Sequence, residues 1–137
     1  MIKAVLFDND GVMSRFTIPR PAMRKLVREL KGHGIKVGML SNVKWFVPIY
    51  KLWRSYNGFD VLLLSYREKI AKPNPEFYRL AIKQLGVKSQ EILFIDNKQK
   101  NLEPAQQLGF KTLHSTSGKQ AHQDIKDCIL KENGIKL

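Results

Sequence analysis

The chain has 137 residues, of which 43% are hydrophobic and 26% charged, a composition typical of one globular domain with a single core. No apolar run approaches the roughly 20 residues of a membrane span, and the single cysteine, Cys128, excludes an internal disulfide and a cysteine-rich metal site. Met1 leads directly into a predicted strand without a secretory leader, so we expect a cytoplasmic protein with no membrane partner.

Basic residues dominate the charge of the chain. Its 24 Lys and Arg residues exceed its 12 Asp and Glu residues and give a net charge of +12. Such a field attracts anions, among them phosphorylated metabolites, nucleotides and nucleic acid. The same charge can also be spread over a surface that binds none of them. It therefore supports an anionic substrate without identifying one.

Predicted strands and helices alternate along the chain. Apolar runs predict strands at 2–7, 35–40, 61–64, 92–95 and 111–113. Apolar residues at helical spacing predict helices at 21–31, 48–56, 75–85, 102–108 and 119–130, while 13–19 and 65–72 are expected to be irregular. This alternation with short connections predicts an α/β fold, in which a parallel sheet has helices on both faces, as a single domain over 1–137.

Two carboxylates, Asp8 and Asp10, follow the first predicted strand and precede Gly11. Like charges this close together are unfavourable unless a cation or a shared proton offsets them, and a divalent metal with oxygen ligands is the simplest partner. Asn, Asp and Gly are also common turn residues. Taken alone, the motif is therefore equally compatible with a turn that has no chemical role.

Polar residues also follow the second and fourth predicted strands: Ser41 and Asn42 after one, Asp96 and Asn97 after the other. Lys72 precedes a Pro-x-Pro turn into a helix and can reach the same edge of the sheet. Each of these residues can be explained as a helix cap or a solvated loop residue. Together, at successive strand ends where parallel sheets bind ligands, they favour a functional site.

These motifs resemble those of the haloacid dehalogenase-like superfamily. The family patterns are hydrophobic-Asp-x-Asp-Gly-Val, hydrophobic-Ser-Asn, Lys-Pro-x-Pro and Ile-Asp-Asp. The matching segments are 6–12, 39–42, 72–75 and, less fully, 94–97, in the family's order over nearly the whole chain. The resemblance implies a Rossmann-like three-layer αβα sandwich whose five parallel strands have the order 5-4-1-2-3.

The same resemblance implies a phosphatase that forms an aspartyl-phosphate. Asp8 is then the nucleophile, and Asp10 protonates the leaving alcohol and afterwards activates water. Lys72 offsets negative charge on Asp8 and on the phosphoryl group. Members that cleave carbon–halogen bonds lack the second aspartate, so Asp10 favours phosphoryl transfer over dehalogenation.

The resemblance also implies binding roles at this edge. Ser41 holds a phosphoryl oxygen with Asn42 beside it, and Lys72 contributes to substrate binding. The implied cofactor is Mg²⁺, and its expected ligands are Asp8, the backbone carbonyl of Asp10, and the motif formed by Asp96 and Asn97.

Two features depart from the family pattern. Asn97 stands where many relatives have a second acid, which removes a charge and weakens metal binding by roughly a kcal/mol or more. The intervals from Val12 to Ser41 and from Asn42 to Lys72 are too short for a cap domain, so we expect an uncapped core. Uncapped members act on large substrates or take a lid from another subunit, which makes a homodimer one possible arrangement.

Two other functions remain open from the sequence. One is a catalytically impaired binding or scaffold protein, which Asn97 and the missing cap would both suit. The other is a nucleic-acid-end phosphatase, suggested by the charge and by the open, uncapped site. In the segment 44–54, Trp45 and Trp53 lie among basic residues and could stack on bases. They could also form a dimer interface, and the favoured interpretation is that they only cover the sheet. The three histidines show no metal-ligand spacing.

Overall fold

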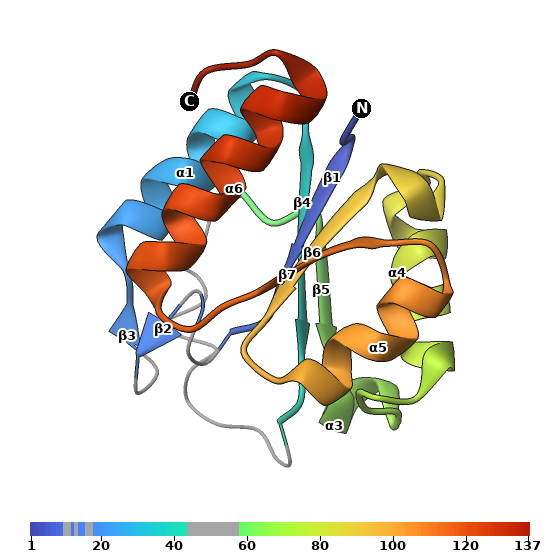
Figure 1. Ribbon diagram of the computed structural model, residues 1–137. Helices are drawn as coiled ribbons and strands as arrows, with labels where there is room; N and C mark the ends of the chain where they lie inside the picture. The colour runs from blue at the N-terminus through green and yellow to red at the C-terminus, as the bar shows by residue number, and fades with distance from the viewer. Residues whose placement is uncertain (10–11, 13, 16–17, 44–57) are drawn as a thin grey trace.

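A parallel five-stranded sheet forms the centre of the computed structural model, which describes residues 1–9, 12, 14–15, 18–43 and 58–137 (Figure 1). Its strands are β1 (Ala4–Phe7), β4 (Lys36–Ser41), β5 (Val61–Leu64), β6 (Ile92–Asp96) and β7 (Lys111–His114). Their order is β5-β4-β1-β6-β7, with β1 in the middle. When the five strands of this sheet are numbered along the chain, the order is 3-2-1-4-5. This is the predicted order 5-4-1-2-3 read from the other edge, so the predicted fold is confirmed.

Helices cover both faces of the sheet and make three layers (Figure 1). On one face lie α1 (Pro21–Gly32) and α6 (Gly118–Asn133), and on the other lie α4 (Pro75–Leu85) and α5 (Gln99–Gln107). Successive strand residues point to opposite faces. In β1, Val5 and Phe7 belong to the core beneath α1 and α6, while Ala4 and Leu6 belong to the core beneath α4 and α5. The strand is apolar throughout because both of its faces are buried.

Helix ends follow local sequence signals. Pro21 and Pro75 lie in the first turns of α1 and α4, where a missing N–H costs no hydrogen bond. Asn74 and Ser117 cap α4 and α6 by accepting hydrogen bonds from the backbone N–H groups of Glu76 and Gln120. These caps define where the chain leaves the edge of the sheet that bears the polar strand ends.

The structure differs from the sequence expectation at four short elements. The segment expected to be irregular contains β2 (Ser14–Arg15) and β3 (Ile18–Pro19), which pair antiparallel. The expected loop after β5 begins with α3 (Ser65–Glu68), and η1 (Ser89–Glu91) is a short 3₁₀ turn before β6. Strands of two residues and single helical turns are too short to show hydrophobic periodicity. The helix predicted at 48–56 lies outside the described residues.

The strand register brings the polar strand ends to one edge. Phe7 of β1 pairs with Met39 of β4 and with Ile95 of β6, so the residues that follow them end at the same level. The first and last residues of the chain lie at the opposite end of the sheet (Figure 1). Within the described residues, no helix is both long enough and apolar enough to cross a membrane.

Candidate active site

A single lysine joins two aspartates at the carboxyl edge of the sheet. The Nζ atom of Lys72 lies 2.9 Å from Oδ1 of Asp8 and 2.7 Å from Oδ2 of Asp96. The lysine and Asp96 side chains are 1% and 0% exposed, and that of Asp8 is 12% exposed. Charge-assisted hydrogen bonds of this length are strong in a buried setting. Two acids and one base therefore form one cluster with a net negative charge.

The sheet positions both carboxylates. Asp8 directly follows β1, and its backbone N–H donates to the carbonyl of Ile95 at 2.9 Å, which continues the ladder one residue beyond the strand. Asp96 is the last residue of β6, and its Oδ1 accepts the backbone N–H of Lys98 at 2.9 Å. The hydrogen bonds of the sheet thus fix the backbone positions of both acids.

Asn42 positions the lysine. Its Nδ2 donates to the backbone oxygen of Lys72, and its Oδ1 accepts the backbone N–H of Lys72, both at 2.9 Å. This pair of bonds ties the loop before α4 to the end of β4. The Lys72 Nζ atom also lies 5.7 Å from the centre of the Phe94 ring, within reach of a cation–π interaction. Both polar atoms of the Asn42 side chain, which was predicted to bind substrate, thus form hydrogen bonds with the backbone of Lys72.

Two buried residues that the sequence analysis did not select complete the cluster. Asn101, in the first turn of α5, donates from Nδ2 to Asp96 Oδ2 at 3.2 Å. The hydroxyl of Tyr78 in α4 donates to the backbone oxygen of Asn101 at 2.5 Å. The signal available in the sequence was a polar residue next to the apolar Leu102, at the start of the helix that follows Asp96. Such a residue usually needs a specific partner.

Asn97 reaches both carboxylates from the exposed side. The inward atom of its side-chain amide lies 3.1 Å from Asp8 Oδ2 and 3.2 Å from Asp96 Oδ1. With Nδ2 inward, the amide donates to both acids. The backbone oxygen of Asn97 lies 3.0 Å from Nε2 of His114, a histidine that the sequence analysis gave no role.

A small cavity of about 150 Å³ opens beside the cluster. It is lined by Asp8, Ser41, Asn42, Lys72, Asn97, Lys98 and Asn101. The structure therefore brings together the predicted site residues at 8, 41, 42, 72 and 97. Asp96 does not line the cavity, but it accepts hydrogen bonds from the lining residues Lys72, Lys98 and Asn101. Asp10 lies outside the described residues.

Burial governs the ionisation of the groups in this cluster. It raises the pKa of the Asp8 carboxyl above its usual value of 3.8, and the nearby Asp96 carboxylate adds to the rise, while Lys72 opposes it. Burial and the two carboxylates also raise the pKa of the Tyr78 phenol. Tyr78 is consequently a neutral hydrogen-bond donor across the ordinary pH range.

Oxygen atoms of Asp8, Asp96 and Asn97 suit a hard divalent cation. Among the described residues, no group of three His, Cys, Asp or Glu side chains is placed to hold a metal ion. Lys72 and Asn101 occupy Oδ2 of Asp96, and Lys72 occupies Oδ1 of Asp8. Asp8 Oδ2, Asp96 Oδ1 and the amide of Asn97 converge on the other side, and oxygen ligands are those that Mg²⁺ prefers. These residues fit a cation site that has two carboxylates and one neutral ligand.

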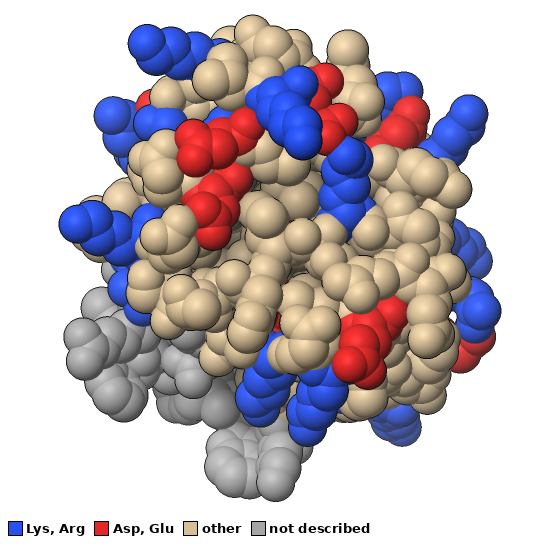
Figure 2. All heavy atoms as spheres, viewed as in Figure 1, with Lys and Arg blue, Asp and Glu red and all other residues tan. Residues whose placement is uncertain are grey.

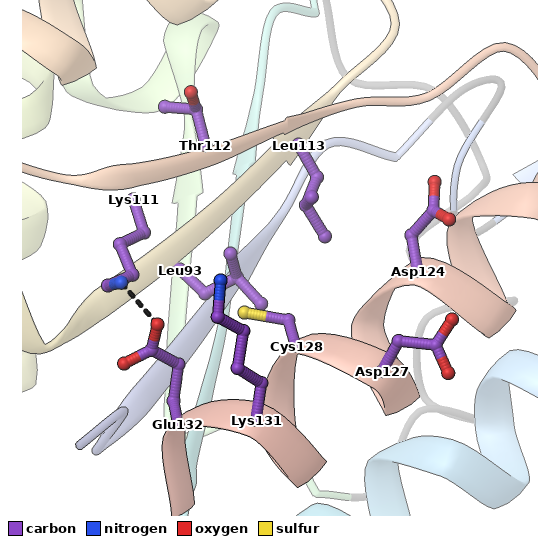
Figure 3. Close-up of a pocket in the computed structure, with 9 residues that line it drawn as sticks. All are labelled: Leu93, Lys111, Thr112, Leu113, Asp124, Asp127, Cys128, Lys131 and Glu132. Carbon is purple, nitrogen blue, oxygen red and sulfur yellow. Dashed lines mark hydrogen bonds and ion pairs between the residues drawn. The ribbon is translucent and has the colours of Figure 1, made fainter.

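A larger hollow of about 430 Å³ lies between β7 and α6 (Figure 3). It shares no described lining residue with the cavity at Asp8. Lys111 and Glu132 pair with each other across it, and burial raises the pKa of the Cys128 thiol, which disfavours the reactive thiolate. Chemistry, not size, therefore identifies the edge at Asp8 as the candidate active site.

Comparison with known proteins identifies the family of the chain. Residues 13–109 match the family of haloacid dehalogenase-like hydrolases. The chain belongs to this family.

Two curated relatives are phosphatases. A sesquiterpene phosphatase of Aspergillus oryzae is 31% identical over 113 residues, which cover 81% of this chain and 58% of the relative. A glyceraldehyde 3-phosphate phosphatase of Methanocaldococcus jannaschii is 30% identical over 142 residues, which cover 93% of this chain and 61% of the relative. The chain thus spans about three fifths of the length of each.

The fold matches a solved member of the same family. The structure superposes on a family enzyme of Bacteroides thetaiotaomicron, crystallised with magnesium and inorganic phosphate, with a TM-score of 0.69. The match covers 86% of this chain and 96% of that one at 18% identity. At this identity, the match shows a common fold.

Replacing the shared lysine tests the buried cluster. We expect Lys72→Met to lower the free energy of unfolding at pH 7 by about 3–5 kcal/mol, because two buried carboxylates lose their common cation. Lys3→Met is the matched control, since Lys3 pairs with Glu91 at 2.9 Å on the surface and its side chain is 55% exposed. That change should cost at most about 1 kcal/mol in urea unfolding. Equal losses for the two variants would contradict the assigned cluster.

The raised pKa of Asp8 predicts a pH-dependent effect of Asp8→Asn. An acid with a raised folded-state pKa costs no stability below its unfolded pKa, near 3.8, and its full penalty appears above the folded pKa. Asparagine cannot ionise, so the stability of Asp8→Asn relative to the parent should increase with pH above about 3.8 and then level off. Urea unfolding at a series of pH values measures this difference.

Glu91→Gln provides a control of opposite sign. The hydrogen bond from Lys3 lowers the pKa of Glu91, so its contribution to stability is present above the usual value of 4.5 and is lost in acid. The cost of Glu91→Gln should therefore increase as the pH rises to about 4.5 and stay constant above it. A relative stability of Asp8→Asn that falls with rising pH would overturn the direction assigned to Asp8.

Proposed function

We propose that the chain is a Mg²⁺-dependent phosphatase that hydrolyses phosphoric monoesters through an aspartyl-phosphate on Asp8. The observation that carries this proposal is the Asp8–Lys72–Asp96 cluster beside a small polar cavity with Ser41 at its wall. The family membership and the two phosphatase relatives support it. The net charge of +12 is consistent with a phosphorylated substrate.

Asp8 is suited to the role of nucleophile. Its Oδ1 is held by Lys72 at 2.9 Å, and its side chain is the most exposed of the three in the cluster. In the proposed first step, an Asp8 oxygen attacks phosphorus, the ester P–O bond breaks and the alcohol leaves. Lys72 stabilises the negative charge of the phosphoryl group as it is transferred. Ser41 and Asn42 line the cavity where that group would lie.

Asp10 has its proposed role from the family resemblance. It donates a proton to the leaving alkoxide in the first step. In the second step it accepts a proton from the water that attacks phosphorus, which breaks the bond between phosphorus and Asp8 and releases phosphate. The carboxylate of Asp8 is thereby restored and the protons balance.

Asp8, Asp96 and Asn97 would hold Mg²⁺, together with the backbone carbonyl of Asp10 that the resemblance implies. The bound ion would supply positive charge that stabilises the phosphoryl oxygens. The magnesium and phosphate in the Bacteroides thetaiotaomicron enzyme of the same fold support this choice of cofactor. Within this chain, Lys98 and Asn101 keep the Asp96 carboxylate oriented by hydrogen bonds at 2.9 and 3.2 Å.

A second candidate function is binding without efficient turnover. The observation that favours it is Asn97, whose amide stands between Asp8 and Asp96 and adds no negative charge for a cation. On the face shown in Figure 2, basic side chains are interleaved with acidic ones and spread over several elements. The nucleic-acid-end alternative depends on how charge is arranged around the site and stays a prediction.

Hydrolysis of an aryl phosphate separates these two functions. We expect the wild-type protein to release aryl alcohol in the presence of Mg²⁺ and to stop when a chelator removes the ion. Asp8→Asn should lower the rate by at least about a thousandfold, because it removes the proposed nucleophile. A panel of phosphorylated metabolites, ranked by kcat/KM, then identifies the substrate class.

Asp127→Asn is the matched control for this assay. It makes the same chemical change at an exposed position of α6, away from the cavity. Its rate should equal that of the wild-type protein. If Asp8→Asn hydrolyses the substrate as fast as wild type, the phosphatase proposal is wrong and the binding function is favoured.

A further inference from the structure

Asn97 holds an unusual place for a neutral residue, because its amide faces two carboxylates at once. The inward amide atom is 3.1 Å from Asp8 Oδ2 and 3.2 Å from Asp96 Oδ1. A half-turn about the last side-chain bond exchanges the oxygen and nitrogen of an amide almost without changing its shape. The two orientations therefore have nearly the same shape, but one presents a hydrogen-bond donor to the carboxylates and the other an acceptor.

With Nδ2 inward, the amide donates one N–H to each carboxylate. This arrangement places two partial positive charges against two acids that share only one lysine. It offsets part of the repulsion between the acids without a metal. With Oδ1 inward, the amide instead presents a third oxygen to two acceptors, which is unfavourable unless a cation lies among them.

The spacing of the oxygens in this second orientation suits Mg²⁺. Octahedral Mg²⁺ binds oxygen at 2.0–2.1 Å, so neighbouring ligand atoms lie about 3 Å apart. The observed separations of 3.1 and 3.2 Å are close to that value. The same three positions therefore form hydrogen bonds when the nitrogen is inward and a partial ligand set when the oxygen is inward.

The backbone around Asn97 is held by hydrogen bonds, whereas the residue itself is exposed. Asp96 belongs to β6, and the N–H of Lys98 holds its Oδ1 at 2.9 Å. His114 Nε2 lies 3.0 Å from the backbone oxygen of Asn97. Asn97 itself is exposed to solvent, so its terminal torsion can change without repacking the core.

We propose that Asn97 is a metal-responsive amide gate. Without metal, its Nδ2 bridges Asp8 and Asp96 in the place of the cation; on Mg²⁺ binding, the amide turns and Oδ1 becomes a ligand. The proposal rests on the proposed function in taking Mg²⁺ as the ion. It goes further by making metal binding compete with two hydrogen bonds of the protein, so that Mg²⁺ must displace both of them before it occupies the site.

Side-chain amide signals in ¹H–¹⁵N NMR spectra test this proposal without an activity measurement. Asn97→Asp removes one pair of signals and thereby identifies those of Asn97. In metal-free wild type, we expect this pair to show the downfield shift of N–H groups bonded to carboxylates. A titration with MgCl₂ should move both signals toward the positions of solvated amides, whereas NaCl at equal ionic strength should not.

Asn97→Asp also predicts a change in metal affinity. It replaces two donors by a third carboxylate, so the metal-free protein should melt a few degrees lower, and Mg²⁺ should bind about tenfold more tightly in calorimetry. Asn74→Asp is the matched control, because Asn74 is exposed and caps α4 with its side-chain oxygen, which aspartate retains. That variant should show the wild-type Mg²⁺ affinity and melting temperature.

The outcomes separate the gate from the phosphatase. Asn97 signals that stay unchanged while Mg²⁺ shifts the backbone signal of Asp8 would overturn the gate, as would absence of Mg²⁺ binding to both wild type and Asn97→Asp. An amide that turns on Mg²⁺ binding in a protein without phosphatase activity would uphold the gate and contradict only the proposed function.

Discussion

The ion pairs of Lys72 with Asp8 and Asp96 are the interaction on which the rest of the site depends. A buried carboxylate without a partner is strongly unfavourable, and two of them side by side are more so. Lys72 contacts both at 2.7–2.9 Å, and the ends of the strands β1, β4 and β6 keep the three residues in place. The register of β1 and β6 brings the acids level, and the side chain of Asn42 holds the lysine backbone from the end of β4.

One lysine for two acids leaves the cluster short of positive charge. This shortage accounts for several properties of the site. The shortage leaves Lys72 unable to offset the burial that, together with the Asp96 carboxylate, raises the pKa of Asp8. It also explains why hydrogen-bond donors gather around Asp96: the N–H of Lys98 and the amide of Asn101 both point at it. The amide of Asn97 lies on the remaining side, where a cation would complete the balance. A site with this excess of negative charge favours binding of a cation, and the bound cation would in turn attract a phosphoryl group.

Much of the fold and the positions of the site residues could be predicted from sequence. Apolar runs identify buried parallel strands, and the carboxyl ends of such strands meet at one edge, so Asp8, Ser41 and Asp96 were expected near each other. The structure brings them to one edge beside Lys72. Their chemical roles, the role of Asp10 and the single uncapped domain stay predictions.

Other features could not be predicted, because they depend on distances between segments far apart in the chain. Nothing local in Asn42 indicates that its side chain binds the backbone of Lys72, which is thirty positions away. Asn101 and Tyr78 join the site only after α4 and α5 pack on the same face of the sheet. The strands β2 and β3 and the helix α3 escaped detection because elements of two to four residues have no period to recognise.

Trapping a covalent intermediate tests the central claim, that Asp8 attacks phosphorus, most directly. The wild-type protein would be mixed with Mg²⁺ and a ³²P-labelled phosphoric monoester, quenched in acid within milliseconds and digested for mass spectrometry. The account predicts label that survives denaturation, is released by hydroxylamine as expected of an acyl phosphate, and maps to the peptide that contains Asp8. Rapid release of phosphate with no label on that peptide at any quench time would contradict it.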